Sequence, residues 1–228
     1  MSMLAIECTH ASLSVAVMIE GREVVEIVNE EWMKAAETLL PLIEQAMAKS
    51  EICLQKLDSI AISSGPGSFT ALRIGMSVAK GMAYGLGIPL IPVPTMPAMA
   101  ASLPIDAGMV IAVIPAQKGA YYYAAYTQDE LFSGTYHNEV YRGAANDIVM
   151  AATSAPEQSG RVVVVGRGLE ELRFLLSATC AHYANADFFT AKSLFPSAER
   201  MYSRTDMRLL DRLVPDYWQT FVPKVGRT

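Results

Sequence analysis

The chain is poor in the residues from which metal centres and disulfide frameworks are built. Among its 228 residues are three cysteines, Cys8, Cys53 and Cys180, which lie far apart and form no C-x-x-C pair. The sequence therefore predicts neither a zinc site nor a disulfide framework, and we interpret each cysteine as a small buried apolar residue. Three histidines are present, and no two stand at the short helical spacing of a metal-binding pair. We expect no metal site.

Further absences argue against whole classes of function. The formal net charge is −5, so the chain lacks the basic excess that a nucleic-acid-binding face needs. Although 52% of the residues are hydrophobic, no uninterrupted apolar run approaches the roughly 20 residues of a membrane span. The N-terminus lacks the regions of a signal peptide, and no G-x-S-x-G elbow supports a Ser-His-Asp site. We expect a cytoplasmic protein with no membrane contact.

The most informative stretch that is present is SSGPGSFTALRIG, residues 63–75. It follows an apolar, strand-like segment at 57–62 and leads into a helix-like segment that ends near residue 86. Glycines at a strand-to-helix turn let backbone N–H groups approach a ligand, and the helix N-terminus favours an anion such as a nucleotide phosphate. A simple tight turn is the other interpretation. We call residues 63–70 the glycine corner.

The predicted strands and helices occur in a similar order in each half of the chain. In the first half, the pattern predicts strands at residues 3–8, 12–20, 23–29, 60–63 and 88–93, and helices at 33–49 and 69–86. In the second half, it predicts strands at 110–114, 120–127, 131–137 and 161–165, a loop at 153–160, and helices at 169–179 and 197–213. This alternation indicates an α/β fold with mixed sheets. The proline-rich stretch 92–104 marks a boundary, so we expect subdomains at 1–100 and 101–228, with the last helix packing back on the first.

The helix at 69–86 is more apolar than a surface helix. Its polar side chains, Arg73, Ser77, Lys80 and Tyr84, form one narrow stripe. The remaining apolar arc covers roughly 220°, whereas a surface helix typically has a stripe of about 100°. One flank of the helix can pack on its own sheet, and the other needs a second cover. That cover could be this chain or another molecule, and composition alone does not separate the two.

The run at 65–75 closely resembles the signature of the bacterial TsaB (YeaZ) family of tRNA threonylcarbamoyladenosine biosynthesis, which reads roughly GPGSFTGLRIG, then A-K-G, then G-x-P. The matching positions are Gly65, Pro66, Gly67, Ser68, Phe69, Thr70, Leu72, Arg73, Gly75, Ala79, Lys80, Gly81, Gly87 and Pro89. The similarity is strong over residues 1–100 and faint beyond. It implies two ribonuclease-H-like or actin-like ATPase subdomains, each with a mixed sheet flanked by helices.

The resemblance also implies partners. In the family, the first two helices bind the larger paralogue TsaD, which holds the active site, and pair with a second copy when TsaD is absent. The ATPase TsaE joins the complex, and this chain is expected to contact tRNA only indirectly, through the complex. The implied interface residues are Leu39, Leu40, Ile43, Met47, Ile74, Gly75, Val78, Ala79 and Met82. No cofactor is expected to bind tightly, and ATP or ADP could lie at the interface with TsaD. The implied nucleotide-proximal residues are Glu7, Thr9, Gly65, Gly67, Ser68, Thr70 and Arg73.

Two departures from the family pattern argue against catalysis by this chain. Glu7 stands where the family usually has Asp, and a displacement of about 1 Å is costly in phosphoryl transfer. Residues 115–120 read Pro-Ala-Gln-Lys-Gly-Ala where the family usually reads Asp-Ala-Arg-Arg-Gly-Glu, so both acids are missing. We therefore predict a subunit without catalytic residues that binds and stabilises TsaD. The alternatives are an actin-fold ATPase or small-molecule kinase acting alone, and a dimer unconnected with tRNA.

Overall fold

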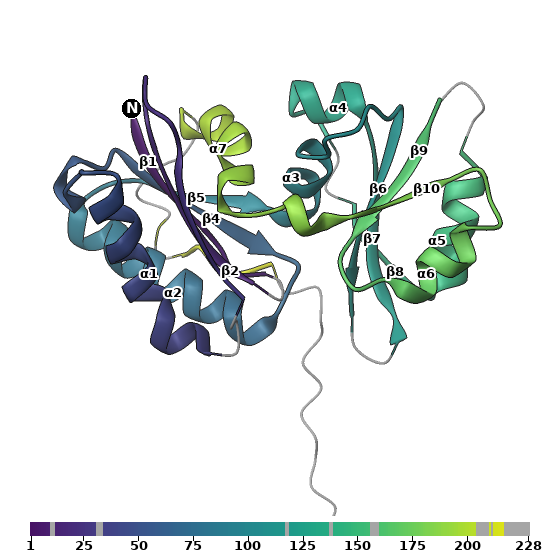
Figure 1. Ribbon diagram of the computed structural model, residues 1–228, viewed down its shortest axis with the longest axis horizontal. Coiled ribbons are helices and arrows are strands. Elements are labelled where there is room, and N and C mark those ends of the chain that lie inside the picture. Colours follow the sequence, from purple (N-terminus) through teal and green to yellow (C-terminus); the bar gives the residue numbers. More distant parts are fainter. Residues whose placement is uncertain are drawn as a thin grey trace, which may run out of the picture.

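The chain forms two five-stranded sheets flanked by helices (Figure 1). The structure is a computed structural model, and it describes residues 1–9, 12–30, 34–116, 119–136, 139–155, 160–203, 210 and 212–216. Residues 117 and 118 of the divergent stretch, His10 and His137 are among the residues outside these ranges. None of the described helices is both long and apolar enough to span a bilayer.

The first sheet contains the strands β1 to β5 in the order β3-β2-β1-β4-β5. Strands β1, β2 and β3 are antiparallel neighbours, whereas β4 and β5 run parallel to β1. The strands are β1 (Ser2–Glu7), β2 (Leu13–Ile19), β3 (Val25–Asn29), β4 (Ser59–Gly65) and β5 (Leu90–Pro94). The helices of this half are α1 (Ala35–Lys49), the 3₁₀ turn η2 (Leu54–Lys56), α2 (Phe69–Leu86) and α3 (Thr95–Ala101).

The second sheet repeats this topology in the order β10-β9-β6-β7-β8. Its strands are β6 (Met109–Pro115), β7 (Tyr121–Thr127), β8 (Tyr141–Gly143), β9 (Val162–Gly166) and β10 (His182–Asn185). Its other elements are α4 (Gln128–Ser133), α5 (Ala145–Thr153), α6 (Glu170–Leu176), η5 (Ala186–Phe188), η6 (Ala191–Leu194) and α7 (Phe195–Tyr202). Strands β6, β7 and β8 are antiparallel, and β9 and β10 are parallel to β6. The predicted fold class is confirmed.

The two faces of the first sheet serve different cores because alternate residues of a strand point to opposite faces. On β1, Leu4 and Ile6 belong to the core shared with α1 and α2. Met3 and Ala5 belong to a second core that also contains Val110 of the other sheet. After β10 the chain returns to the first sheet, where η6 contacts β1 and β2, and α7 contacts β5. The boundary at residue 100 stays a prediction.

Three local predictions are wrong. Residues 131–137 were expected as a strand, but α4 occupies their start, because Thr127 and Glu130 form a reciprocal capping box that begins a helix. The helix expected over 197–213 ends as α7 at Tyr202, and Leu213 is not helical, whereas residues 204–209 and 211 of that range lie outside the described residues. Cys8 is buried, but Cys53 and Cys180 lie in exposed loops, so two of the three cysteines are not core residues.

Candidate functional site

The glycine corner joins the end of β4 to the start of α2 and is packed against the end of β1. A Cβ atom on Gly67 would lie 2.5 Å from Cβ of Thr9, so no larger residue fits there. The backbone N–H of Ser68 donates to the carbonyl of Thr9 at 2.9 Å. Ser68 also caps α2, because its hydroxyl accepts a hydrogen bond from the N–H of Ala71 at 3.5 Å. Close contact with Thr9 therefore explains why residue 67 is a glycine.

The other side of the corner is in contact with the C-terminal segment. The N–H of Asp216 donates to the carbonyl of Ser64 at 2.8 Å, and the Ser64 hydroxyl donates to the Asp216 carboxylate at 2.9 Å. Gly65 has a φ of +116°, and a Cβ atom there would lie 2.9 Å from the carbonyl oxygen of Asp216. Burial raises the pKa of Asp216, and the Ser64 hydrogen bond acts in the opposite direction. The carboxylate of Asp216 thus lies beside the glycine corner.

Two backbone donors of the corner are used within the chain. The N–H of Gly65 donates to the Thr95 hydroxyl at 3.1 Å, and the N–H of Ser68 goes to Thr9. Thr70 and Arg73 lie on the exposed side of the first turns of α2, where the Arg73 guanidinium stacks 4.3 Å above the Phe69 ring. The structure therefore gathers the predicted nucleotide-proximal residues around the ends of β1 and β4. Nucleotide binding itself stays a prediction.

Glu7 lies at the end of β1 and is fully buried. Its Oε1 atom accepts hydrogen bonds from the Thr9 backbone N–H at 2.7 Å and from the Thr9 hydroxyl. Its Oε2 atom is buried and has no hydrogen-bond partner among the described residues. Burial raises the pKa of Glu7, whereas the hydrogen bonds and the charge of Arg167 act to lower it. The Glu7 carboxyl group is thus enclosed by protein, with one oxygen hydrogen-bonded and the other buried.

Replacing Glu7 by glutamine should therefore change how stability depends on pH. The folded state holds the proton more tightly than the unfolded chain, because burial raises the pKa above its ordinary value of 4.5. Wild type should lose stability relative to Glu7→Gln as the pH rises from that value, by about 1.4 kcal/mol for each unit of raised pKa. Urea unfolding between pH 4 and pH 8 measures the difference. Parallel stability curves for the two proteins would contradict a raised pKa.

A substitution at Gly67 tests the packing of the corner. Gly67→Ala should destabilise the fold by about 1–3 kcal/mol, because its methyl group would overlap backbone atoms of Thr9. Gly81→Ala is the matched control, since nothing lies within 4 Å of a Cβ atom at that position of α2. The control should gain about 0.5–1 kcal/mol, as alanine favours a helix. Equal unfolding free energies for the two variants would show that Gly67 is not a packing residue.

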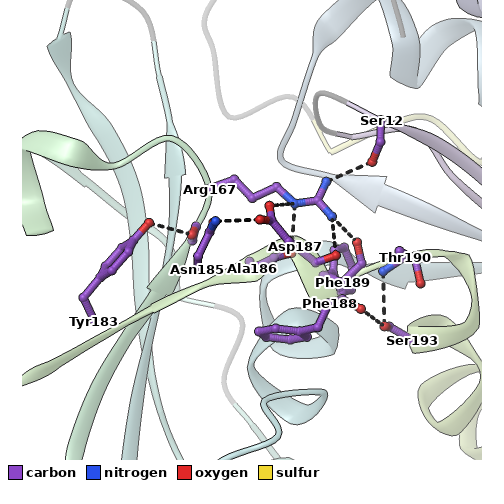
Figure 2. Close-up of polar contacts among 11 residues, drawn as sticks. Ser12, Arg167, Tyr183, Asn185, Ala186, Asp187, Phe188, Phe189, Thr190 and Ser193 are labelled. Carbon is purple, nitrogen blue, oxygen red and sulfur yellow. Dashed lines mark hydrogen bonds and ion pairs between the residues drawn. The ribbon is translucent and has the colours of Figure 1, made fainter. Parts of the chain in front are cut away.

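A second Gly-x-Gly turn, which was not singled out from the sequence, lies at the end of β9 in the other sheet. Gly166-Arg167-Gly168 follows β9, which occupies in its sheet the place that β4 occupies in the first. Figure 2 shows the Arg167 side chain lying between residues 186–189 and Ser12. Its guanidinium donates to the carbonyls of Ala186 (2.8 Å) and Phe189 (2.6 Å) and to the Ser12 hydroxyl (3.1 Å). Arg167 therefore ties the second sheet to the turn before β2.

The predicted interface residues are divided between the core and the surface. α1 and α2 lie side by side and both pack on the first sheet (Figure 1). Leu40 is 52% exposed, and Ile74, Val78 and Met82 are partly buried. The remaining five predicted residues are buried within the chain: Leu39, Ile43, Met47, Gly75 and Ala79. These five already contact the sheet and the neighbouring helix, and their contact with a partner stays a prediction.

Part of the second cover expected for α2 comes from this chain. Leu210 and Leu213 pack against the core that α1 and α2 share. The Lys80 ammonium group donates to the carbonyl of Leu213 at 3.1 Å, which holds this segment beside α2. The segment continues to Asp216 at the glycine corner. The surface left for another molecule is therefore the exposed side of α1 and α2 around Leu40 and Val78.

Comparison with known proteins identifies the family. The family model "TsaD: tRNA N6-adenosine threonylcarbamoyltransferase" matches residues 32–154. The tRNA threonylcarbamoyladenosine biosynthesis protein TsaB of Escherichia coli K12 is 32% identical over 178 residues, which cover 74% of this chain and 72% of that protein. The chain belongs to the TsaB family. The TsaB of Haemophilus influenzae is 29% identical over 162 residues, covering 70% of this chain and 66% of that protein.

Solved structures agree with the TsaB fold. YeaZ from Pseudomonas aeruginosa superposes with a TM-score of 0.75 at 20% identity, over 95% of this chain and 99% of that one. A second P. aeruginosa structure, of an uncharacterized protein with similarity to peptidase YeaZ, gives a TM-score of 0.77 at 20% identity, over 96% and 99% of the two chains. The resemblance inferred from residues 65–75 is thus confirmed for this TsaB chain.

Proposed function

We propose that this chain is a subunit without catalytic residues that binds and stabilises TsaD during N6-threonylcarbamoyladenosine formation in tRNA. The burial of Glu7 is the observation that carries this proposal. One carboxylate oxygen is bound to Thr9 and the other is buried, so the carboxylate is not exposed for Mg²⁺ in the way that an ATPase acting alone would need. Phosphoryl transfer depends on such positioned charges.

The shared ancestry of the two subunits supports pairing through α1 and α2. The TsaD of Geobacter sp. M21 is 34% identical to this chain over 107 residues, which cover 40% of this chain. A twofold dimer uses the same patch on both copies, and a related subunit can offer an equivalent patch. The half-exposed apolar residues Leu40, Val78 and Met82 supply the apolar centre that an interface needs.

We also expect the other partners that the family resemblance implies. Without TsaD we expect a second copy of this chain on α1 and α2. With TsaD we expect ATP or ADP at the joint near the glycine corner, TsaE in the assembled complex, and tRNA only through that complex. We expect this complex in the cytoplasm.

Co-purification tests the proposal and separates it from an ATPase acting alone. A tagged copy of this chain, expressed in its native cell, should retain TsaD through gel filtration. The purified chain should show no ATP hydrolysis above buffer with Mg²⁺. Hydrolysis that Glu7→Ala abolishes would establish the enzyme instead. A homodimer that retains no TsaD, although it is purified from cells that contain TsaD, would favour a dimer unconnected with tRNA.

A further inference from the structure

A hollow of about 240 Å³ lies between α3, α4 and α7. These helices lie on the opposite side of the first sheet from α1 and α2 (Figure 1). The walls of the hollow are mainly apolar and include Ala100, Leu103, Val110 and Leu131. A ligand in this hollow would therefore not compete with a partner on α1 and α2.

The mouth of the hollow exposes large apolar side chains. Phe132, at the end of α4, is 70% exposed, and Ile105, in the loop after α3, is 39% exposed. Exposed apolar residues that gather around a concavity are characteristic of a binding site, whereas single ones are common anywhere on a surface. The apolar walls and this rim together favour a ligand with a hydrocarbon body.

Arg200 of α7 provides the one charged group among the described residues that line the hollow. Its guanidinium donates to the hydroxyl of Ser197 at 3.2 Å, and its side chain passes within 3.6 Å of a Cβ position on Gly134 at the end of α4. Arg200 makes no ion pair with any described residue. The planar guanidinium fork is well suited to a carboxylate, which it binds through two parallel hydrogen bonds.

We propose that this hollow binds a small apolar carboxylic acid, with the hydrocarbon part between α3, α4 and α7 and the carboxylate on Arg200. The volume of about 240 Å³ lies just below the roughly 300 Å³ at which pockets for drug-sized ligands begin, so one ring or a short branched chain fills it. Walls from three helices enclose the hollow as a recess, which accepts one compact molecule. The charge on Arg200 selects an anion among such molecules.

Binding of 3-phenylpropionate by ligand-observed NMR tests this site, and 3-phenylpropanol serves as its uncharged control. The acid should bind wild type with a dissociation constant of about 1 mM or tighter. Arg200→Met keeps an apolar stem but removes the charge, so acid binding should weaken about tenfold while alcohol binding changes less than about twofold. Ala101→Trp, at an exposed position on the rim, should block both ligands.

Arg173→Met on the exposed side of α6 is the matched control and should leave acid binding unchanged. Thermal unfolding of all variants checks that each is folded, as expected for exposed positions. Failure of the acid to bind wild type would overturn the proposal. Equal affinity for acid and alcohol, or unchanged acid binding by Arg200→Met, would overturn the role of Arg200. Acid binding that survives in Ala101→Trp would place the ligand elsewhere.

Discussion

Replacing Leu40 by aspartate should abolish the association of this chain with TsaD and with a second copy, while leaving its fold intact. Leu40 is 52% exposed on α1, so a carboxylate there remains hydrated in the monomer. An interface would remove that water and leave the charge unpaired, which costs several kcal/mol. We expect a loss of affinity of at least about 100-fold, measured by co-purification with TsaD and by light scattering of the isolated chain.

The control for this experiment is Met150→Asp on α5. Met150 is 61% exposed, so the same kind of change is made on a helix of the other sheet. Met150→Asp should associate as wild type does. Val78→Asp provides a second variant on α2, and it should also reduce stability because Val78 packs against the core. Full association of both Leu40→Asp and Val78→Asp would show that α1 and α2 do not form the interface.

Replacing Arg167 by methionine should destabilise the whole chain by about 3 kcal/mol or more. The change keeps an apolar stem but removes the donors to Ala186, Phe189 and Ser12. The two carbonyls accept in a buried setting, and hydrogen bonds to a charged donor are worth about 1.5–3 kcal/mol each. For a chain of this length the melting temperature should fall by about 6–12 °C, as differential scanning calorimetry would measure.

Two further variants show whether the loss comes from these bonds. Ser12→Ala removes only the hydroxyl acceptor, which is part-buried, and should cost about 1 kcal/mol. Arg173→Met, at an exposed position of α6, should stay within about 0.5 kcal/mol of wild type. If Arg167→Met has the same melting temperature as wild type, the contact between Arg167 and the turn before β2 does not stabilise the fold.

The local elements of the first half were predictable because their signals lie within a few residues. α2 was predicted at 69–86 and has the bounds Phe69–Leu86. Ser68 caps its first turn, and Gly87 ends it in the left-handed conformation with a φ of +67°. α4 was missed because its capping box precedes the residues on which a strand was expected.

The site was harder to predict because its contacts join distant parts of the chain. Ser64 and Asp216 are 152 residues apart, and Arg167 and Ser12 are 155 residues apart. No pattern along the sequence pairs such positions, although the repeated Gly-x-Gly after β4 and β9 could have drawn attention to Arg167. The apolar arc of α2 was predicted from the sequence. Which of its residues pack on the sheet, on α1 or near Leu213, and which stay exposed, depends on the folded arrangement.

The position of the C-terminal segment has a consequence for biosynthesis. Leu210, Leu213 and Asp216 complete the surroundings of a helix and a turn far earlier in the chain, since Leu213 is 133 residues after Lys80 and Asp216 is 152 residues after Ser64. A ribosome makes the β-strands of the first sheet long before it makes these residues. One side of α2 and the glycine corner therefore stay uncovered until Leu210, Leu213 and Asp216 have been made and can pack against them.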